Sequence, residues 1–260
     1  IYKKISITIV LYQENISTIS KCLNNLKNFK IVIIDNSGNQ KLKKDVINRF
    51  NIYKYIVNKK NVGFSKAANQ AIKLCSTEYI LNLEADCIIK AEDILILYNS
   101  FNKYDNCFMV TPTFYDEKFD LSYNGGPLPE KNISMEILNL KGDTCVDTPL
   151  TAAILFKRQK FIDMGLFDED LFIYFPDFDL GRRVNGLKKS IIQIHKARAF
   201  HVMGNLKIRN NIKKIFFRNY YFTLDELLYY FKTNSHQKKY LELKSKILSM
   251  FYKAILNLIL

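Results

Sequence analysis

The sequence has no paired cysteines and no long apolar run. Its five cysteines are scattered and show no Cys-x-x-Cys spacing: Cys22, Cys75, Cys87, Cys107 and Cys145. This argues against a zinc or disulfide framework and indicates the reduced thiols of a cytoplasmic protein. No apolar run reaches the roughly 18 residues of a transmembrane helix. No signal peptide is visible in the sequence, which begins at Ile1 without a methionine.

Acidic residues are scarce in the last quarter of the chain. Residues 196–260 hold 13 lysines or arginines against three acids, so +10 of the net charge of +14 lies there. A basic tail indicates a nucleic acid, an anionic membrane or an anionic substrate as the partner, and a solvated helix surface is the plain alternative. With 260 residues, 48% of them hydrophobic, the chain is expected to form one large domain or one domain with an appendage.

Short apolar runs alternate with amphipathic segments in the first half of the chain. Strands are expected at 5–11, 30–34, 53–57 and 79–83, and helices at 15–28, 41–50 and 65–75. This alternation predicts an α/β fold with a doubly wound, mostly parallel sheet flanked by helices. Further on, helices are expected at 91–102 and 159–164, and strands at 108–112, 151–156 and 191–194. Right-handed crossovers then place Asp35, Gly63, Glu84 and Asp86 at one edge of the sheet.

The stretch from Asn61 to Asp86 organises the rest of the chain. Asn61 and Gly63 suit a tight turn because both tolerate positive φ. Glu84 and Asp86 follow a buried strand and point the same way if the chain stays extended. Open α/β sheets bind ligands at the carboxyl ends of their strands, and two carboxylates there suit a divalent cation that carries a diphosphate. A strand that ends in solvated acids is the plain alternative.

Two later stretches also contain candidate functional residues. Residues 114–147 are polar, contain Gly125 and Gly126, and are expected to form an irregular insertion that contacts a substrate. In residues 166–183 aromatic residues alternate with acids, and Asp177 and Asp179 are expected to precede a helix. Asp177 could simply cap that helix. His201 follows another predicted strand and could reach the same edge of the sheet.

Four blocks in this order resemble the inverting family 2 glycosyltransferases with the GT-A fold, most closely their bacterial rhamnosyltransferase-like branch. The blocks are Val10-Leu-Tyr12, Asp35-Asn-Ser37, Asn61-Val-Gly-Phe-Ser-Lys-Ala-Ala-Asn69, and Gly165-Leu-Phe-Asp-Glu through Phe175-Pro-Asp-Phe-Asp-Leu180, with Phe200-His201 after them. The family's metal motif usually reads Asp-x-Asp or Asn-Pro-Asp, whereas Glu84-Ala85-Asp86 stands here. Pro176 replaces the glutamate that usually precedes the catalytic aspartate, which bears on acceptor placement or on tuning of the base.

The resemblance implies a role for each matching residue. Asp177 is the general base, and Asp86 ligates Mg²⁺ or Mn²⁺ with His201 as a second ligand. Nucleotide binding falls to Val10, Tyr12, Asp35, Asn61, Gly63, Asn69 and Glu84. Acceptor binding is expected at Gly125, Gly126, Asp168, Glu169 and Asp179.

The expected reaction moves a sugar from dTDP-rhamnose or a UDP-sugar to a hydroxyl of a glycan or lipid-linked acceptor, in bacterial surface polysaccharide synthesis. A nucleotidyltransferase acting on sugar phosphates is one alternative, but such an enzyme usually has a glycine-rich basic loop after its first strand. A non-enzymatic nucleic-acid-binding protein is the other. It ranks lower, and no nucleic acid is expected, because the basic tail should lie apart from the carboxylate edge.

Residues 1–206 are expected to form the catalytic domain, with a nucleotide-binding half (1–112) and an acceptor-binding half (113–206). Residues 207–260 are expected to form a basic, aromatic-rich helical tail, whose apolar end at 247–260 has the length of an interfacial helix. Two partners stay open for this tail. One is the inner face of the plasma membrane, and the other is the protein itself, by packing on the catalytic domain or by forming a homodimer.

Overall fold

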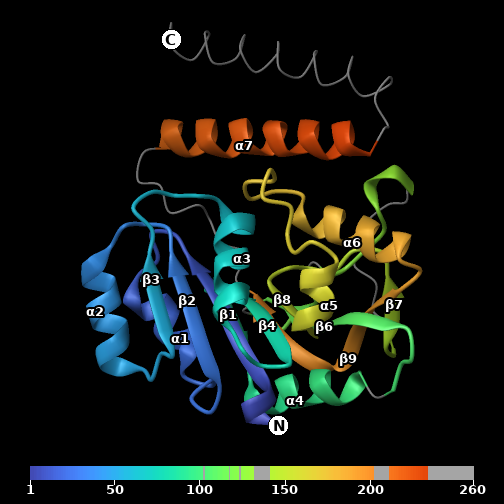
Figure 1. Ribbon diagram of the computed structural model, residues 1–260, viewed down its shortest axis with the longest axis horizontal. Coiled ribbons are helices and arrows are strands. Elements are labelled where there is room, and N and C mark those ends of the chain that lie inside the picture. Colours follow the sequence, from blue (N-terminus) through green and yellow to red (C-terminus); the bar gives the residue numbers. More distant parts are fainter. Residues whose placement is uncertain (102, 117, 123, 132–140, 202–210, 234–260) are drawn as a thin grey trace, which may run out of the picture.

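A computed structural model describes residues 1–101, 103–116, 118–122, 124–131, 141–201 and 211–233 (Figure 1). The strands are β1 (Ile5–Leu11), β2 (Lys30–Asp35), β3 (Lys54–Val57), β4 (Tyr79–Glu84), β5 (Cys87–Ile89), β6 (Cys107–Tyr115), β7 (Thr144–Val146), β8 (Ala153–Lys157) and β9 (Ser190–His201). The helices are α1 (Ile16–Leu23), α2 (Gln40–Arg49), α3 (Phe64–Leu74), α4 (Ala91–Ser100), α5 (Arg158–Asp163), α6 (Pro176–Gly186) and α7 (Asn211–Lys232).

One mixed sheet runs through the molecule. Its strand order is β3-β2-β1-β4-β8-β6-β9-β5, and β7 pairs with β9. The first four strands of this order are parallel, as expected for strands joined through helices. β8 is antiparallel to both β4 and β6, and β5 and β7 are antiparallel to β9. The parallel arrangement predicted from the alternation therefore describes the N-terminal half, and antiparallel pairs dominate the rest.

Helices cover both faces of the sheet. Buried residues of α1, α2 and α4 join one apolar cluster, and those of α3, α5 and α6 join another. Side chains of a strand point alternately to the two faces, so Ile31 and Ile33 of β2 enter the first cluster while Val32 and Ile34 enter the second. A strand buried on both faces is apolar at every position, which is why these strands were recognisable in the sequence.

Some predicted boundaries differ from the structure. Asn15 caps α1, as expected, by accepting a hydrogen bond from the Thr18 amide at 2.8 Å, but the helix ends at Leu23 and not near residue 28. Two asparagines follow Leu23, and asparagine is a weak helix former. Asp177 and Asp179 lie inside the first turn of α6 and do not precede it. His201 ends one long strand that begins at Ser190, where two separate strands were expected.

The described part of the basic tail packs against the segment before α6. In Figure 1, α7 lies across the top of the molecule, above α3 and α6. Tyr229 and Tyr230 form an apolar cluster with Leu171 and Phe175 of the segment before α6. Of the arrangements left open for the tail, packing on the preceding part of the chain is the one that residues 211–233 adopt.

Two predictions about the tail fall on residues outside the described part of the chain. These are the boundary at residue 206 and the apolar end at 247–260. No helix in the described ranges is long and apolar enough to cross a membrane.

Candidate active site

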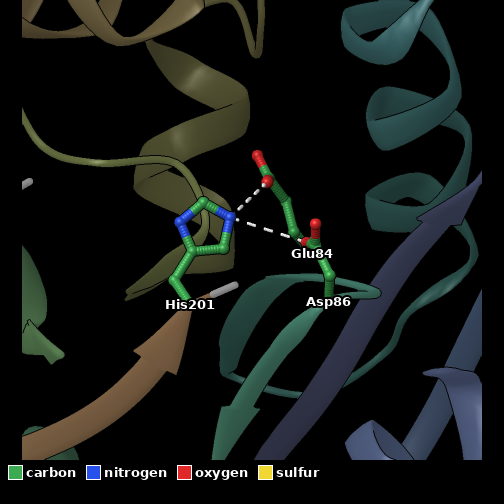
Figure 2. A group of neighbouring side chains, drawn as sticks. All are labelled: Glu84, Asp86 and His201. Carbon is green, nitrogen blue, oxygen red and sulfur yellow. Dashed lines mark ion pairs between the residues drawn. The ribbon is translucent and has the colours of Figure 1, made fainter. Parts of the chain in front are cut away.

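Glu84, Asp86 and His201 converge at one end of the sheet (Figure 2). Glu84 is the last residue of β4, and Asp86 lies in the turn that leads into β5. β5 pairs with β9 so that Cys87 lies opposite His201, which brings the imidazole back to the turn. His201 Nε2 is 3.3 Å from Glu84 Oε2 and 3.5 Å from Asp86 Oδ1. The predicted meeting of these three side chains is present, and their role in metal binding stays a prediction.

The chemistry of this cluster suits a divalent cation. One ligand atom from each residue lies within 4.8 Å of the other two. Burial opposes protonation of His201, but its contacts with Asp86 and Glu84 outweigh burial and raise the imidazole pKa to about 10. Metal binding at such sites generally releases protons, so a cation bound here would compete with protonation of His201.

Asp177 lies at the second position of α6 and does not cap the helix. Its Oδ1 accepts a hydrogen bond from the Thr151 amide at 2.8 Å. Phe175 is the N-cap residue, with φ of 65°, and its side chain makes no cap hydrogen bond. Pro176 takes the first helical position, where its fixed φ is favourable and its missing N–H costs nothing. The proline that replaces the family's usual glutamate at position 176 therefore favours the start of the helix that carries Asp177.

The carboxyl of Asp177 is tuned by its surroundings. Burial raises its pKa to about 6, against the hydrogen bond from Thr151. The charge of Glu84 adds to the increase and His201 opposes it, so Asp177 lies within electrostatic range of the three-residue cluster. A carboxylate with a pKa near the working pH is suited to general base catalysis.

Strand register brings the predicted nucleotide-binding residues of the first strands together. Val10 of β1 lies between Ile34 of β2 and Glu84 of β4. Asp35 is fully buried, and its carboxylate accepts hydrogen bonds from the Ser37 amide at 2.7 Å and the Tyr55 hydroxyl at 2.9 Å. Asp35 therefore stabilises the turn after β2 from the protein interior, and its carboxylate is not exposed to a ligand.

The loop before α3 has the tight turn that its sequence predicts. Asn61 Oδ1 accepts a hydrogen bond from the Gly63 amide at 2.9 Å, and Gly63 has φ of 88°. Asn69, further along α3, exchanges two hydrogen bonds with the backbone of Phe167, at 2.9 and 3.0 Å. Because Asn69 is almost fully buried, this exchange ties α3 to the loop after α5. Tyr12 stacks on Phe217 of α7 with ring centroids 6.3 Å apart.

The predicted acceptor-binding residues all have partners within the protein. Gly126 pairs with Thr148 through two backbone hydrogen bonds, and a Cβ on Gly125 would lie 2.6 Å from the carbonyl oxygen of Thr148. The side-chain partners of the three acids are Lys232 for Asp168, Asn69 for Glu169, and Arg182 and Arg183 for Asp179. Asp179 is buried, so its geometry favours a structural role, whereas Asp168 and Glu169 remain partly exposed.

Two contributors to the site were not singled out from the sequence. The Thr151 amide holds Asp177, and a backbone group leaves no sequence signal. Asp225 of α7 binds the segment before α6 and was counted only as one of three acids in the tail. Its spacing to Tyr229 and Lys232, which is i, i+4 and i+7, places the three on one helix face and was the available signal.

Comparison with known protein families gives one match. The family model described as Glycosyl transferase family 2 matches residues 6–163. A search of curated proteins found no match.

Three solved structures share the fold. GalNAc-T7 with UDP, GalNAc and Mn²⁺ has a TM-score of 0.61 at 17% identity, covering 76% of this chain and 44% of that one. TarS from S. aureus has a TM-score of 0.57 at 18% identity, covering 77% and 37%. The mannosyltransferase PcManGT from Pyrobaculum calidifontis, in complex with GDP-Man and Mn²⁺, has a TM-score of 0.56 at 12% identity, covering 78% and 58%.

At these identities the structural likeness shows the fold alone, which confirms the predicted GT-A architecture. The chain matches between 37% and 58% of the length of these proteins, so it corresponds to only part of each. The family match covers more than half of the sequence and favours a glycosyltransferase over a nucleotidyltransferase or a nucleic-acid-binding protein. The chain belongs to glycosyl transferase family 2.

Proposed function

We propose that this protein transfers a sugar, with inversion, from a nucleoside diphosphate sugar to a hydroxyl of a glycan or lipid-linked acceptor in bacterial surface polysaccharide synthesis. The proposed donor is dTDP-rhamnose or a UDP-sugar, in line with the resemblance to the rhamnosyltransferase-like branch. The observation that carries the proposal is the cluster of Glu84, Asp86 and His201, with Asp177 in electrostatic range of it, at one end of a GT-A sheet.

Asp86 and His201 would hold a divalent cation, with Glu84 beside them. When bound, such a cation offsets the negative charge that develops on a diphosphate leaving group. The side chains of Glu84 and Asp86 are 36% and 21% exposed, so the cluster can be reached from solvent. Mg²⁺ prefers oxygen ligands, and the imidazole therefore favours Mn²⁺ in this set.

Asp177 would accept the proton of the acceptor hydroxyl as that oxygen attacks the anomeric carbon. The other two carboxylates near the site, Glu84 and Asp86, both contact His201, and we propose Asp86 as a ligand of the metal and Glu84 as a contact of the nucleotide. One free carboxylate acting as base, without a second as nucleophile, implies a single displacement and inversion at the anomeric carbon.

The donor nucleotide would lie between the end of β1, with Val10 and Tyr12, and the turn before α3, with Asn61 and Gly63. The acceptor would enter from the half formed by residues 113–206, where Gly125, Gly126, Asp168 and Glu169 lie. The division into these two halves and a tail from residue 207 is part of the proposal. For the outer face of α7 we propose contact with an anionic membrane, and homodimerisation is the alternative.

A donor screen tests the proposal. Purified protein would be incubated with dTDP-rhamnose, UDP-sugars and GDP-mannose, with Mn²⁺ or Mg²⁺, and release of free nucleoside diphosphate would be measured. Release from one donor that requires the metal, and that the Asp177→Asn variant lacks, supports the function. The proposal fails if every donor releases diphosphate no faster with wild type than with the variant. Proton NMR of the product would show whether the anomeric configuration is inverted.

A further inference from the structure

A buried carboxylate lies outside the proposed catalytic cluster, on α7. Asp225 is fully buried, and its Oδ1 accepts a hydrogen bond from the Phe172 amide at 2.9 Å. Its Oδ2 accepts from the amides of Ile173 at 2.9 Å and Tyr174 at 2.8 Å. Burying a carboxylate is unfavourable unless hydrogen bonds compensate it, and three consecutive amides do so here. One side chain therefore fixes the backbone of three successive residues.

Two further side chains on the same face of α7, those of Tyr229 and Lys232, make polar contacts with the rest of the protein. The Tyr229 hydroxyl donates to Glu130 Oε1 at 2.7 Å. Lys232 Nζ lies 2.6 Å from Asp168 Oδ2 and 2.7 Å from Asp170 Oδ2. The Lys232 contacts hold the start of the segment that leads to Phe172, so α7 binds that segment at both ends.

Towards the donor side, the segment held by Asp225 touches the turn before α3. The carbonyl oxygen of Phe172 accepts a hydrogen bond from the Phe64 amide at 2.6 Å. A Cβ on Gly63 would lie 2.7 Å from that oxygen, so the two backbones are in direct contact. The Phe172 ring stacks on Tyr221 of α7 with centroids 3.9 Å apart. The position of Phe172 thus determines where the proposed nucleotide turn lies.

Towards the catalytic side, the segment runs directly into the first turn of α6. Phe175 has φ of 65°, a left-handed conformation that is unfavourable for a residue with a Cβ. Its ring packs against Phe222 and Tyr229 of α7, with centroids 5.3 and 5.5 Å away. Packing by α7 therefore holds the unfavourable residue from which α6, and with it Asp177, begins.

From these contacts we infer that Asp225 is a positioning residue. By ordering residues 172–174, it fixes the positions of both the proposed nucleotide turn at Gly63 and the proposed base Asp177. Its effect on turnover rests on the proposed function, whereas its effect on order in the segment does not. Helix α7 is accordingly part of the proposed transferase site.

The test compares Asp225→Asn and Asp225→Ala with the matched control Asp105→Asn, an exposed aspartate in the turn before β6. Asparagine keeps one acceptor oxygen and alanine keeps none, so the alanine variant should show the larger effect. Hydrogen exchange would be followed by mass spectrometry in peptides covering 170–180 and 61–66, with β1 as the internal reference. We expect exchange in both peptides to quicken about tenfold or more, while β1 stays protected. The control should match wild type.

Turnover separates positioning from general stability. With the donor found in the screen, we expect kcat per folded molecule of Asp225→Asn to fall about tenfold or more, since misplacing reacting groups is costly. The inference is overturned if exchange rises evenly across the protein, or if kcat per folded molecule is unchanged. If wild type transfers no sugar at all, the proposed function fails, and the exchange pattern alone still decides whether Asp225 orders residues 172–174.

Discussion

Asp177 is the residue whose surroundings most resemble those of a general base, because it is half-buried, held by one amide and within electrostatic range of the acidic cluster. Replacing it by asparagine keeps the size and the bond from Thr151 but removes the proton acceptor. We expect Asp177→Asn to lower kcat by about 10²–10⁴-fold and to leave donor affinity nearly unchanged. Steady-state transfer and calorimetric donor binding would measure the two effects. Near-full turnover at saturating acceptor would show that another group is the base.

The same carboxyl predicts a pH dependence. Its pKa of about 6 means that the base is ionised above pH 6 and protonated below it. We therefore expect kcat/KM to be level above this value and to fall about tenfold per pH unit below it. The profile should be measured at saturating Mn²⁺, so that protonation of His201 does not contribute. An acidic limb near pH 4 would mean that burial does not raise the pKa of Asp177 in solution.

Asp86 carries the proposed metal site. We expect Asp86→Ala to remove the gain in nucleoside diphosphate affinity that Mn²⁺ provides, because a ligand to the cation is lost. Calorimetry of UDP or dTDP with and without Mn²⁺ measures this gain. Glu92→Ala is the matched control, since Glu92 is a largely exposed acid on the neighbouring α4. Asp93 would be a poor control because it is buried and accepts a hydrogen bond from the Arg198 amide of β9, the strand that carries His201. Metal-independent, equal affinity in wild type and Asp86→Ala would reject the site.

At the scale of elements, the turn before α3 and the segment before α6 are in close backbone contact. Gly63 has φ of 88°, and a Cβ there would lie 2.7 Å from the carbonyl oxygen of Phe172. We expect Gly63→Ala to lower the free energy of unfolding by about 1–2 kcal/mol from backbone conformation alone, with more from displacing Phe172. Urea unfolding measures the change.

Gly186→Ala is the matched control for this substitution. Gly186 ends α6, and a Cβ there would meet no atom within 4 Å. Alanine in a helix is favoured over glycine by about 0.5–1 kcal/mol, so this variant should be neutral or slightly stabilised. Equal effects of the two substitutions would mean that the approach of the two loops contributes nothing to stability.

At the scale of the whole molecule, α7 has two faces with different tasks. Its inner face binds the segment before α6, which leads to Asp177. Deleting the tail would therefore disturb the site, and a loss of membrane binding in that variant could not be interpreted. The outer face of α7 leaves Ile212, Ile215, Phe216 and Tyr220 at least half exposed, with Lys213 also exposed. Apolar side chains with basic neighbours on one helix are typical of binding at an anionic membrane surface, where each basic residue adds about 1 kcal/mol.

We expect the protein to sediment with anionic vesicles, not with neutral ones, and to be released at high salt. The double variant Ile212→Ser and Phe216→Ser should lose this binding while keeping turnover, because both side chains point away from the site. Ile47→Ser, a change at an exposed residue of α2, should behave as wild type. A protein that ignores vesicles and is a dimer by light scattering, but becomes a monomer in the double variant, would favour the homodimer instead.

Local residue pattern determined much of this protein. The mostly apolar runs at 30–34 and 79–83 predicted β2 and β4, because a strand buried on both faces is apolar at most positions. Asn61 and Gly63 predicted the turn, since few residue types tolerate positive φ. The resemblance to a family supplied the roles of Asp86, Asp177 and His201, which no spacing along the chain could establish.

Only the tertiary structure decided what faces what. The antiparallel pairing of β5 with β9 brings His201 to within 3.5 Å of Asp86, more than a hundred residues away in the chain. Asp225 meets the amides of 172–174 across some fifty residues, and its basic, aromatic surroundings pointed to a surface helix. The periodicity of apolar residues predicts which side of a helix or strand is buried. It does not predict that a single carboxylate on that side binds backbone amides elsewhere in the chain. Its partner therefore becomes known only when the chain is folded.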